Sequence, residues 1–169
     1  MIMDMDEQAA RKLVIGWFSF TCCEDSTIIF TELLNDHFDE WKKIIEFRHV
    51  KALKTNNELR DLDVAFIEGA ISSPTQAEEV KNIRQNSKKV VAIGNCACTS
   101  LPSAARNQFK KDALPEKIMW YYETFDYTDV QKLEDVIQVD DKVLGCPMLV
   151  PQFVDVVTKY LKEFQIIND

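Results

Sequence analysis

The chain has 169 residues and a formal net charge of −8, with 46% hydrophobic and 28% charged residues. This length and composition are typical of one compact globular domain over residues 1–169, and they exclude a disordered or fibrous chain. The acidic balance excludes a nucleic-acid surface, because phosphate binding needs a basic stripe that the sequence lacks. No apolar stretch approaches the ~20 residues that span a bilayer, and the start, Met1 to Glu7, is acidic where a secretory signal is basic. We therefore expect a cytoplasmic protein with no membrane span of its own.

Four apolar runs rich in β-branched residues predict strands of a mainly parallel sheet. They lie at residues 13–20, 44–50, 63–69 and 89–94. The second run alternates, which places it nearer an edge of the sheet. The connecting segments predict helices, as expected for a doubly wound α/β fold with helices on both faces.

The first helix is predicted over about 25–35, ending in a polar Asn-Asp-His cluster. The second begins at a Ser73 cap and continues to about residue 87. Residues 102–110 predict a short helix, 112–127 are aromatic and hard to place, and 129–143 are interpreted as polar connecting chain. Pro151 opens a terminal helix whose apolar stripe is made of Val154, Val157, Leu161 and Phe164.

Five cysteines fall into three groups, each just beyond an apolar run: Cys22-Cys23, Cys96 with Cys98, and Cys146. A doubly wound fold brings such groups to one sheet edge, where ligands bind. An odd cysteine count in a reducing compartment argues against a disulfide framework. Any one of these cysteines alone is more simply a small buried hydrophobe. Their shared position indicates an iron-sulfur cluster held by four thiolates.

Three of the four glycines, Gly69, Gly94 and Gly145, directly precede a candidate site loop, which suits sharp turns off strand ends. None of the glycines forms a G-x-G-x-x-G phosphate loop, so a flavin or nucleotide site is not expected. His37 and His49 are isolated from the cysteine groups and are interpreted as structural or surface residues.

The segments 20–24 (Phe-Thr-Cys-Cys-Glu), 66–69 (Phe-Ile-Glu-Gly), 94–99 (Gly-Asn-Cys-Ala-Cys-Thr) and 144–147 (Leu-Gly-Cys-Pro) resemble the cluster-binding module of nickel-iron hydrogenase small subunits and of the related 20 kDa subunit of respiratory complex I. The resemblance runs in order over about residues 12–151. It implies a flavodoxin-like domain in which one 4Fe-4S cluster, the proximal cluster, is held by Cys22, Cys23, Cys96 and Cys146.

The resemblance also implies a role. The chain would be a non-catalytic electron-transfer subunit of an oxidoreductase, relaying electrons between a large catalytic subunit of nickel-iron hydrogenase type and another redox carrier. Nickel would be bound in that partner, and further redox subunits are compatible with the resemblance. A rival from another class is a cluster-free flavodoxin-like interaction or scaffold domain in the same kind of complex.

The sequence departs from its relatives at two places. Many hydrogenase small subunits have Cys-x-x-Cys, and if Cys23 is the first cysteine of that pair, the second falls here on Ser26. The complex I relatives instead have adjacent cysteines, as in Cys22-Cys23. We favour the adjacent pair because iron prefers thiolate to serine oxygen, and it requires a bent backbone. Ser26 and the spare Cys98 remain alternative ligands. The second departure is Ser100-Leu101, which stands where the family commonly has paired glycines.

Two further features are left open by the sequence. Glu68 ends a strand, where it is either an interface or proton-relay residue near the cluster, or a solvated loop carboxylate or helix cap. The segment Met119 to Tyr122 is our first candidate for an apolar docking surface.

Overall fold

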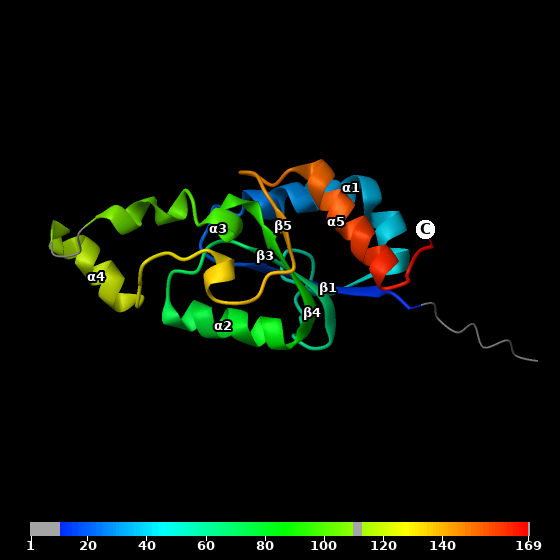
Figure 1. Cartoon of the computed structure of the whole chain (residues 1–169), viewed down its shortest axis with the longest axis horizontal. Coiled ribbons are helices and arrows are strands. Elements are labelled where there is room, and N and C mark those ends of the chain that lie inside the picture. Colours follow the sequence, from blue (N-terminus) through cyan, green and yellow to red (C-terminus); the bar gives the residue numbers. More distant parts are fainter. Residues whose placement is uncertain (1–10, 110–112, 169) are drawn as a thin grey trace, which may run out of the picture.

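The computed structural model describes residues 11–109 and 113–168, and these form a five-stranded parallel sheet in the order β2-β1-β3-β4-β5 (Figure 1). The strands are β1 (Leu13–Ser19), β2 (Ile45–Val50), β3 (Leu62–Glu68), β4 (Ser87–Ile93) and β5 (Asp141–Val143). This strand order is that of flavodoxin-like folds. The predicted doubly wound α/β class is confirmed, and β2 lies at the edge as expected.

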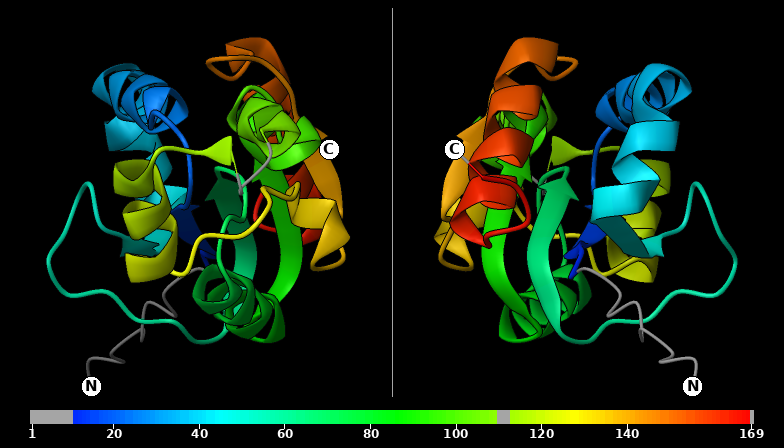
Figure 2. Two further views of the ribbon diagram at one scale, coloured as in Figure 1. Left: turned by 90° about the vertical axis from the view of Figure 1, so that its left-hand side faces the viewer. Right: turned by 90° about the vertical axis from the view of Figure 1, so that its right-hand side faces the viewer.

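Helices cover both faces of the sheet (Figures 1 and 2). The helices are α1 (Asp25–Ile44), α2 (Pro74–Gln85), α3 (Gly94–Thr99), α4 (Glu116–Thr124) and α5 (Val150–Glu163), with 3-10 turns η1 (Ser103–Gln108) and η3 (Leu133–Asp135). One core cluster lies between the sheet and α1 with α5, where Trp17 stacks on Phe30. The second lies between the opposite face and α2, α3 and η3. The interiors of β1 and β3 and the second half of β4 are therefore covered on both sides, as their continuous apolar runs predict.

The strand register brings four strand ends to one level. Ser19 pairs with Glu68, Glu68 with Ile93, and Ile93 with Val143. Because the strands are parallel, the loops that leave these four residues all start from the same edge of the sheet. Each of the three cysteine groups follows one of these strand ends.

Two expectations from the sequence were wrong. The first helix does not stop near Asn35 but continues to Ile44, because the polar cluster faces outward while Trp41 packs into the core. Packing of this kind overrides weak local stop signals. The segment 129–143 is not merely connecting chain, since it contains η3 and the edge strand β5. Three residues are too few to show a period, and β5 exists because it pairs with β4.

The other boundaries agree closely with expectation. Ser73 caps α2 by accepting the backbone N–H of Gln76 at 3.2 Å, and α5 begins at Val150, one residue before Pro151. The predicted helix at 102–110 is the 3-10 turn η1, and its last residue, Lys110, lies outside the described residues, as does Asp112.

The elements η1 and α4 project from the body of the molecule as an arm (Figure 1). No residue of either element is buried. The arm carries aromatic side chains, and Trp120 is 56% exposed. Among the described residues, no helix is long and apolar enough to cross a membrane.

Asp63 connects three segments at the amino end of the sheet. Its carboxylate is 2% exposed. It accepts the backbone N–H of Val14 at 3.0 Å, the guanidinium of Arg11 at 2.9 Å and the ammonium of Lys88 at 2.7 Å. The side chain therefore joins β1, β3 and β4 where the strands begin.

We expect Asp63→Ala to lower the free energy of unfolding by about 2 kcal/mol, because it leaves the Val14 N–H without its partner and removes the acceptor shared by two cations. Urea denaturation followed by circular dichroism measures this. Glu78→Ala, which breaks the exposed pair between Glu78 and Lys81, is the matched control and should cost less than about 0.5 kcal/mol. Equal losses for the two variants would contradict the prediction.

Candidate metal centre

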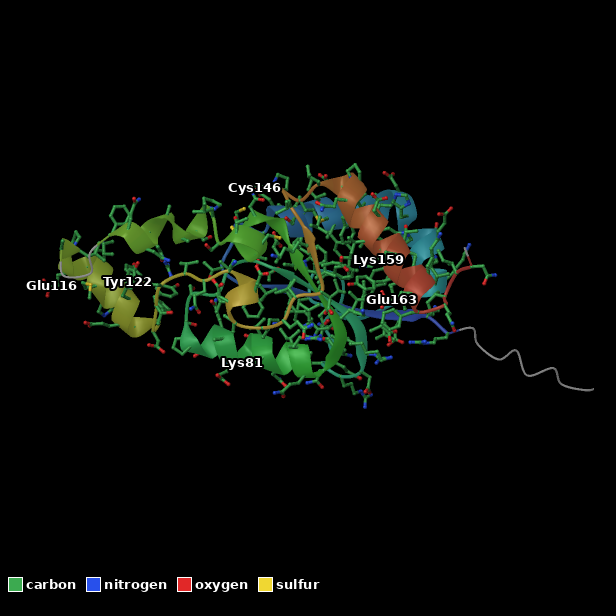
Figure 3. The ribbon with its side chains drawn as sticks, in the orientation of Figure 1. Lys81, Glu116, Tyr122, Cys146, Lys159 and Glu163 are labelled. Carbon is green, nitrogen blue, oxygen red and sulfur yellow. The ribbon has the colours of Figure 1, made fainter. Side chains whose placement is uncertain are left out.

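A hollow at the carboxyl edge of the sheet is lined by all four predicted ligands, Cys22, Cys23, Cys96 and Cys146. They come from the loops after β1, β4 and β5. Cys146 lies at the end of the body from which the arm projects (Figure 3). The fifth cysteine, Cys98, does not line the hollow. The fold therefore brings together the four thiols that the sequence singles out.

The turn that carries Cys22 and Cys23 is sharply bent, as adjacent ligands require. Thr21 is held by a bridge to Ala70, the chain bends at Cys22, and Glu24 adopts a left-handed conformation with φ 63°. Such a φ is uncommon for a residue with a side chain. The bend ends where α1 begins at Asp25, so the two neighbouring thiols both reach the hollow.

Asn95 fastens the Cys96 loop to the Cys146 loop. Its backbone N–H donates to the carbonyl of Gly145 at 2.8 Å, and its side-chain oxygen accepts the N–H of Gly145 at 2.9 Å. Asn95 was not among the residues predicted for the site. The sequence could have indicated Asn95, because it stands between a strand-end glycine and a cysteine, and Asn commonly forms side-chain-to-backbone hydrogen bonds at such turns.

Gly145 makes this close approach possible. Its φ of 118° is strained for any other residue, and a Cβ there would lie 2.4 Å from the carbonyl oxygen of Pro147. Gly69 and Gly94 also have positive φ, so the predicted role of glycines in the site turns is confirmed.

Ser100, at the position of a family glycine, has φ 64° and donates its N–H to the carbonyl of Cys96 at 3.1 Å. The backbone thus keeps a glycine-like shape without the glycine.

The two alternative ligands have different positions. Ser26 lines the hollow, but its hydroxyl is buried and accepts the N–H of Met148 at 3.2 Å. Cys98 is 5% exposed in the second core cluster, where its thiol contacts the carbonyl oxygens of Ala92 and Val143 at 3.5 and 3.6 Å. Burial raises the pKa of Cys98 to about 11. Cys98 is thus a core residue in this structure, whereas Ser26 supports the Cys146 loop.

Glu68 also lines the hollow and is 3% exposed, so it is not a solvated loop carboxylate. One oxygen accepts the N–H of Ser26 at 2.9 Å, and the other accepts the hydroxyl of Thr27 at 2.6 Å. Glu68 is therefore a helix cap, but for α1 rather than for the helix that follows it in sequence. The bond ties the turn carrying Cys22 and Cys23 to β3.

The four thiols differ in environment. Cys22 is partly buried, and burial together with the negative Glu68 raises its pKa to about 12, so the thiol form is favoured until a cation binds. Cys96 is buried, and its sulfur lies 3.3 Å from the Ser103 hydroxyl. Cys23 and Cys146 are exposed. Within residues 11–109 and 113–168, no group of three or more His, Cys, Asp or Glu side chains is arranged to hold a single metal ion.

Two curated relatives are similar over most of the chain. One subunit of the F420-non-reducing hydrogenase of Methanothermobacter marburgensis is 30% identical over 174 residues, which cover 93% of this chain and 56% of the relative. The corresponding subunit of Methanothermobacter thermautotrophicus is 31% identical, covering 82% of this chain and 50% of the relative. The chain spans about half the length of the curated relatives it matches.

The fold is shared with solved hydrogenases. A chain of an NAD⁺-reducing [NiFe]-hydrogenase superposes with a TM-score of 0.76 at 19% identity, covering 89% of this chain and 92% of that one. A [NiFeSe] hydrogenase chain from Desulfovibrio vulgaris Hildenborough superposes with a TM-score of 0.66 at 12% identity, covering 92% of this chain and 62% of that one.

The family model described as NADH ubiquinone oxidoreductase, 20 Kd subunit, matches residues 22–160. The chain therefore belongs to this family of hydrogenase-related and complex I-related 20 kDa subunits.

Proposed function

We propose that the chain is an electron-transfer subunit in which Cys22, Cys23, Cys96 and Cys146 hold one 4Fe-4S cluster. The observation that carries the proposal is the convergence of these four thiols, from three separate loops, on one hollow at the carboxyl edge of the sheet. Membership of the family and similarity to hydrogenase subunits support it. When bound, such a cluster takes up and releases single electrons.

The four thiols that line the hollow form a soft donor set. In a 4Fe-4S cluster each of four thiolates binds a different iron. Four soft thiolates select iron-sulfur clusters over hard cations. The donor set therefore supports a cluster.

The chain's own residues hold the ligands and shape their surroundings. Asn95 keeps Cys146 beside Cys96, and the Glu68 cap keeps Cys22 and Cys23 on the same hollow. The Ser103 hydroxyl, 3.3 Å from the Cys96 sulfur, is placed to donate to that thiolate. Hydrogen bonds to ligand sulfurs stabilise the more reduced state and are one of the protein's means of setting a cluster potential.

The edge around the hollow supports a partner of the nickel-iron hydrogenase large-subunit type. Four exposed aliphatic side chains lie within a few residues of the site cysteines in the chain: Ile28, Leu101, Leu144 and Leu149. The arm adds Trp120 and Tyr121, within the segment expected to dock. Exposed apolar groups of this kind mark interaction surfaces. A covering subunit would shield a surface cluster and exchange electrons with it over a short distance.

The first prediction here concerns composition. The anaerobically purified full chain, in its complex, should contain about four irons and four sulfides per copy, the stoichiometry of one cluster. Colorimetric iron and sulfide assays on the same sample measure this. Iron near zero in an oxygen-free preparation would instead support the cluster-free scaffold domain.

The second prediction concerns the ligands. Cys22→Ala and Cys23→Ala should each lose or convert the cluster, since each removes one thiolate, and the paramagnetic resonance spectrum of the reduced sample reports this. Cys98→Ala is the matched control, which deletes a core thiol and should keep the spectrum. Ser26→Ala should also keep it, while costing about 1 kcal/mol of stability because the Met148 N–H loses its acceptor. A silent Cys22→Ala with an altered Ser26→Ala would reassign the ligand to serine.

The third prediction concerns docking. The double variant Trp120→Ala, Tyr121→Ala should bind its large subunit at least about tenfold more weakly, because exposed aromatics commonly dominate interface energy. Titration of the purified subunits by calorimetry gives the affinity. The control is Phe38→Ala, which removes an exposed aromatic from α1, away from the arm. Unchanged affinity of the double variant would remove the arm from the interface.

A further inference from the structure

Two acidic side chains among the described residues are buried, and they differ in whether a cation lies beside them. Asp63, at the amino edge of the sheet, is paired with Arg11 and Lys88. Glu68, at the carboxyl edge, takes part in none of the ion pairs of the described chain. One buried carboxylate is thus neutralised by cations, and the other is not.

Glu68 is stabilised by neutral donors. Ser26 N–H and the Thr27 hydroxyl each donate to one of its oxygens, at 2.9 and 2.6 Å. The Thr27 oxygen accepts in turn from the Trp17 indole N–H at 2.8 Å. Because the Thr27 proton is committed to Glu68, the Ser19 hydroxyl, 3.2 Å from Thr27, must also donate to it. This network of neutral hydrogen-bond donors holds the Glu68 carboxylate in place without cancelling its charge.

From this arrangement we propose that Glu68 is a fixed negative charge that keeps the reduction potential of the bound cluster low. The inference rests on the proposed function. Glu68 lines the same hollow as the four cysteines, and adding an electron beside a buried anion is unfavourable. At an effective dielectric constant of 20, a unit charge up to about 12 Å from the cluster changes the equilibrium between its oxidised and reduced forms by about tenfold or more. Glu68 is in this sense a positioning and tuning residue and not a ligand.

The test is Glu68→Gln in the full chain within its complex. Glutamine keeps the shape and the acceptor for the Ser26 N–H but has no charge. At a fixed applied potential, the ratio of reduced to oxidised cluster, measured by paramagnetic resonance, should rise at least tenfold, which is 59 mV for one electron. Glu32→Gln is the matched control, since it removes the same charge from an exposed carboxylate on α1 that does not line the hollow, and it should change the reduced-to-oxidised ratio less than about twofold because water and salt screen the charge.

The outcomes are distinguishable. A wild-type complex without iron overturns the proposed function and this inference with it. A wild-type cluster whose reduced-to-oxidised ratio is unchanged in Glu68→Gln overturns the inference alone. A folded Glu68→Gln that holds no iron also overturns it, because Glu68 would then be required for binding. If Glu68→Gln does not fold, Glu68→Met, neutral and of similar length, must show the same upward shift.

Discussion

The register of the parallel sheet is the constraint on which the site depends. Ser19, Glu68, Ile93 and Val143 are paired across four neighbouring strands, so all four strands stop at one level. A slip of one residue in any pair would turn buried side chains to the opposite face, and the two core clusters prevent it. The cysteine loops therefore meet at one edge because the core fixes where the strands end.

The loops that leave this edge must also turn toward one another to bring the cysteines to one hollow. Their backbone makes these turns in conformations that are rare for residues with side chains. Glu24 and Ser100 have positive φ although both carry side chains, and Gly145 approaches the chain too closely for a Cβ. Strain of this kind persists only where surrounding structure over-determines it. Here the surrounding structure includes the Asn95 clasp and the Glu68 cap, each of which joins two loops or strands.

The same edge combines exposed apolar groups with a buried acid, although the chain as a whole is acidic. Leu144 and Leu149, on either side of Cys146 in the chain, and Leu101, which follows α3, are exposed, while Glu68 lines the hollow and is buried. A partner that covered this edge would exclude water and strengthen every interaction of the buried charge. Docking and electrostatics are therefore linked in the proposed role.

The sequence by itself determined the fold class, four of the strands and the helix starts at Asp25 and Ser73, because apolar runs and capping residues are local signals. It also singled out the four cysteines. Only the tertiary structure extended α1 to Ile44 and created β5, since Trp41 and the pairing with β4 act between distant segments. It likewise decided that Cys98 lies in the core and that Asn95 and Glu68 hold the loops, because hydrogen bonds across 42 to 50 residues leave no periodic trace in the chain.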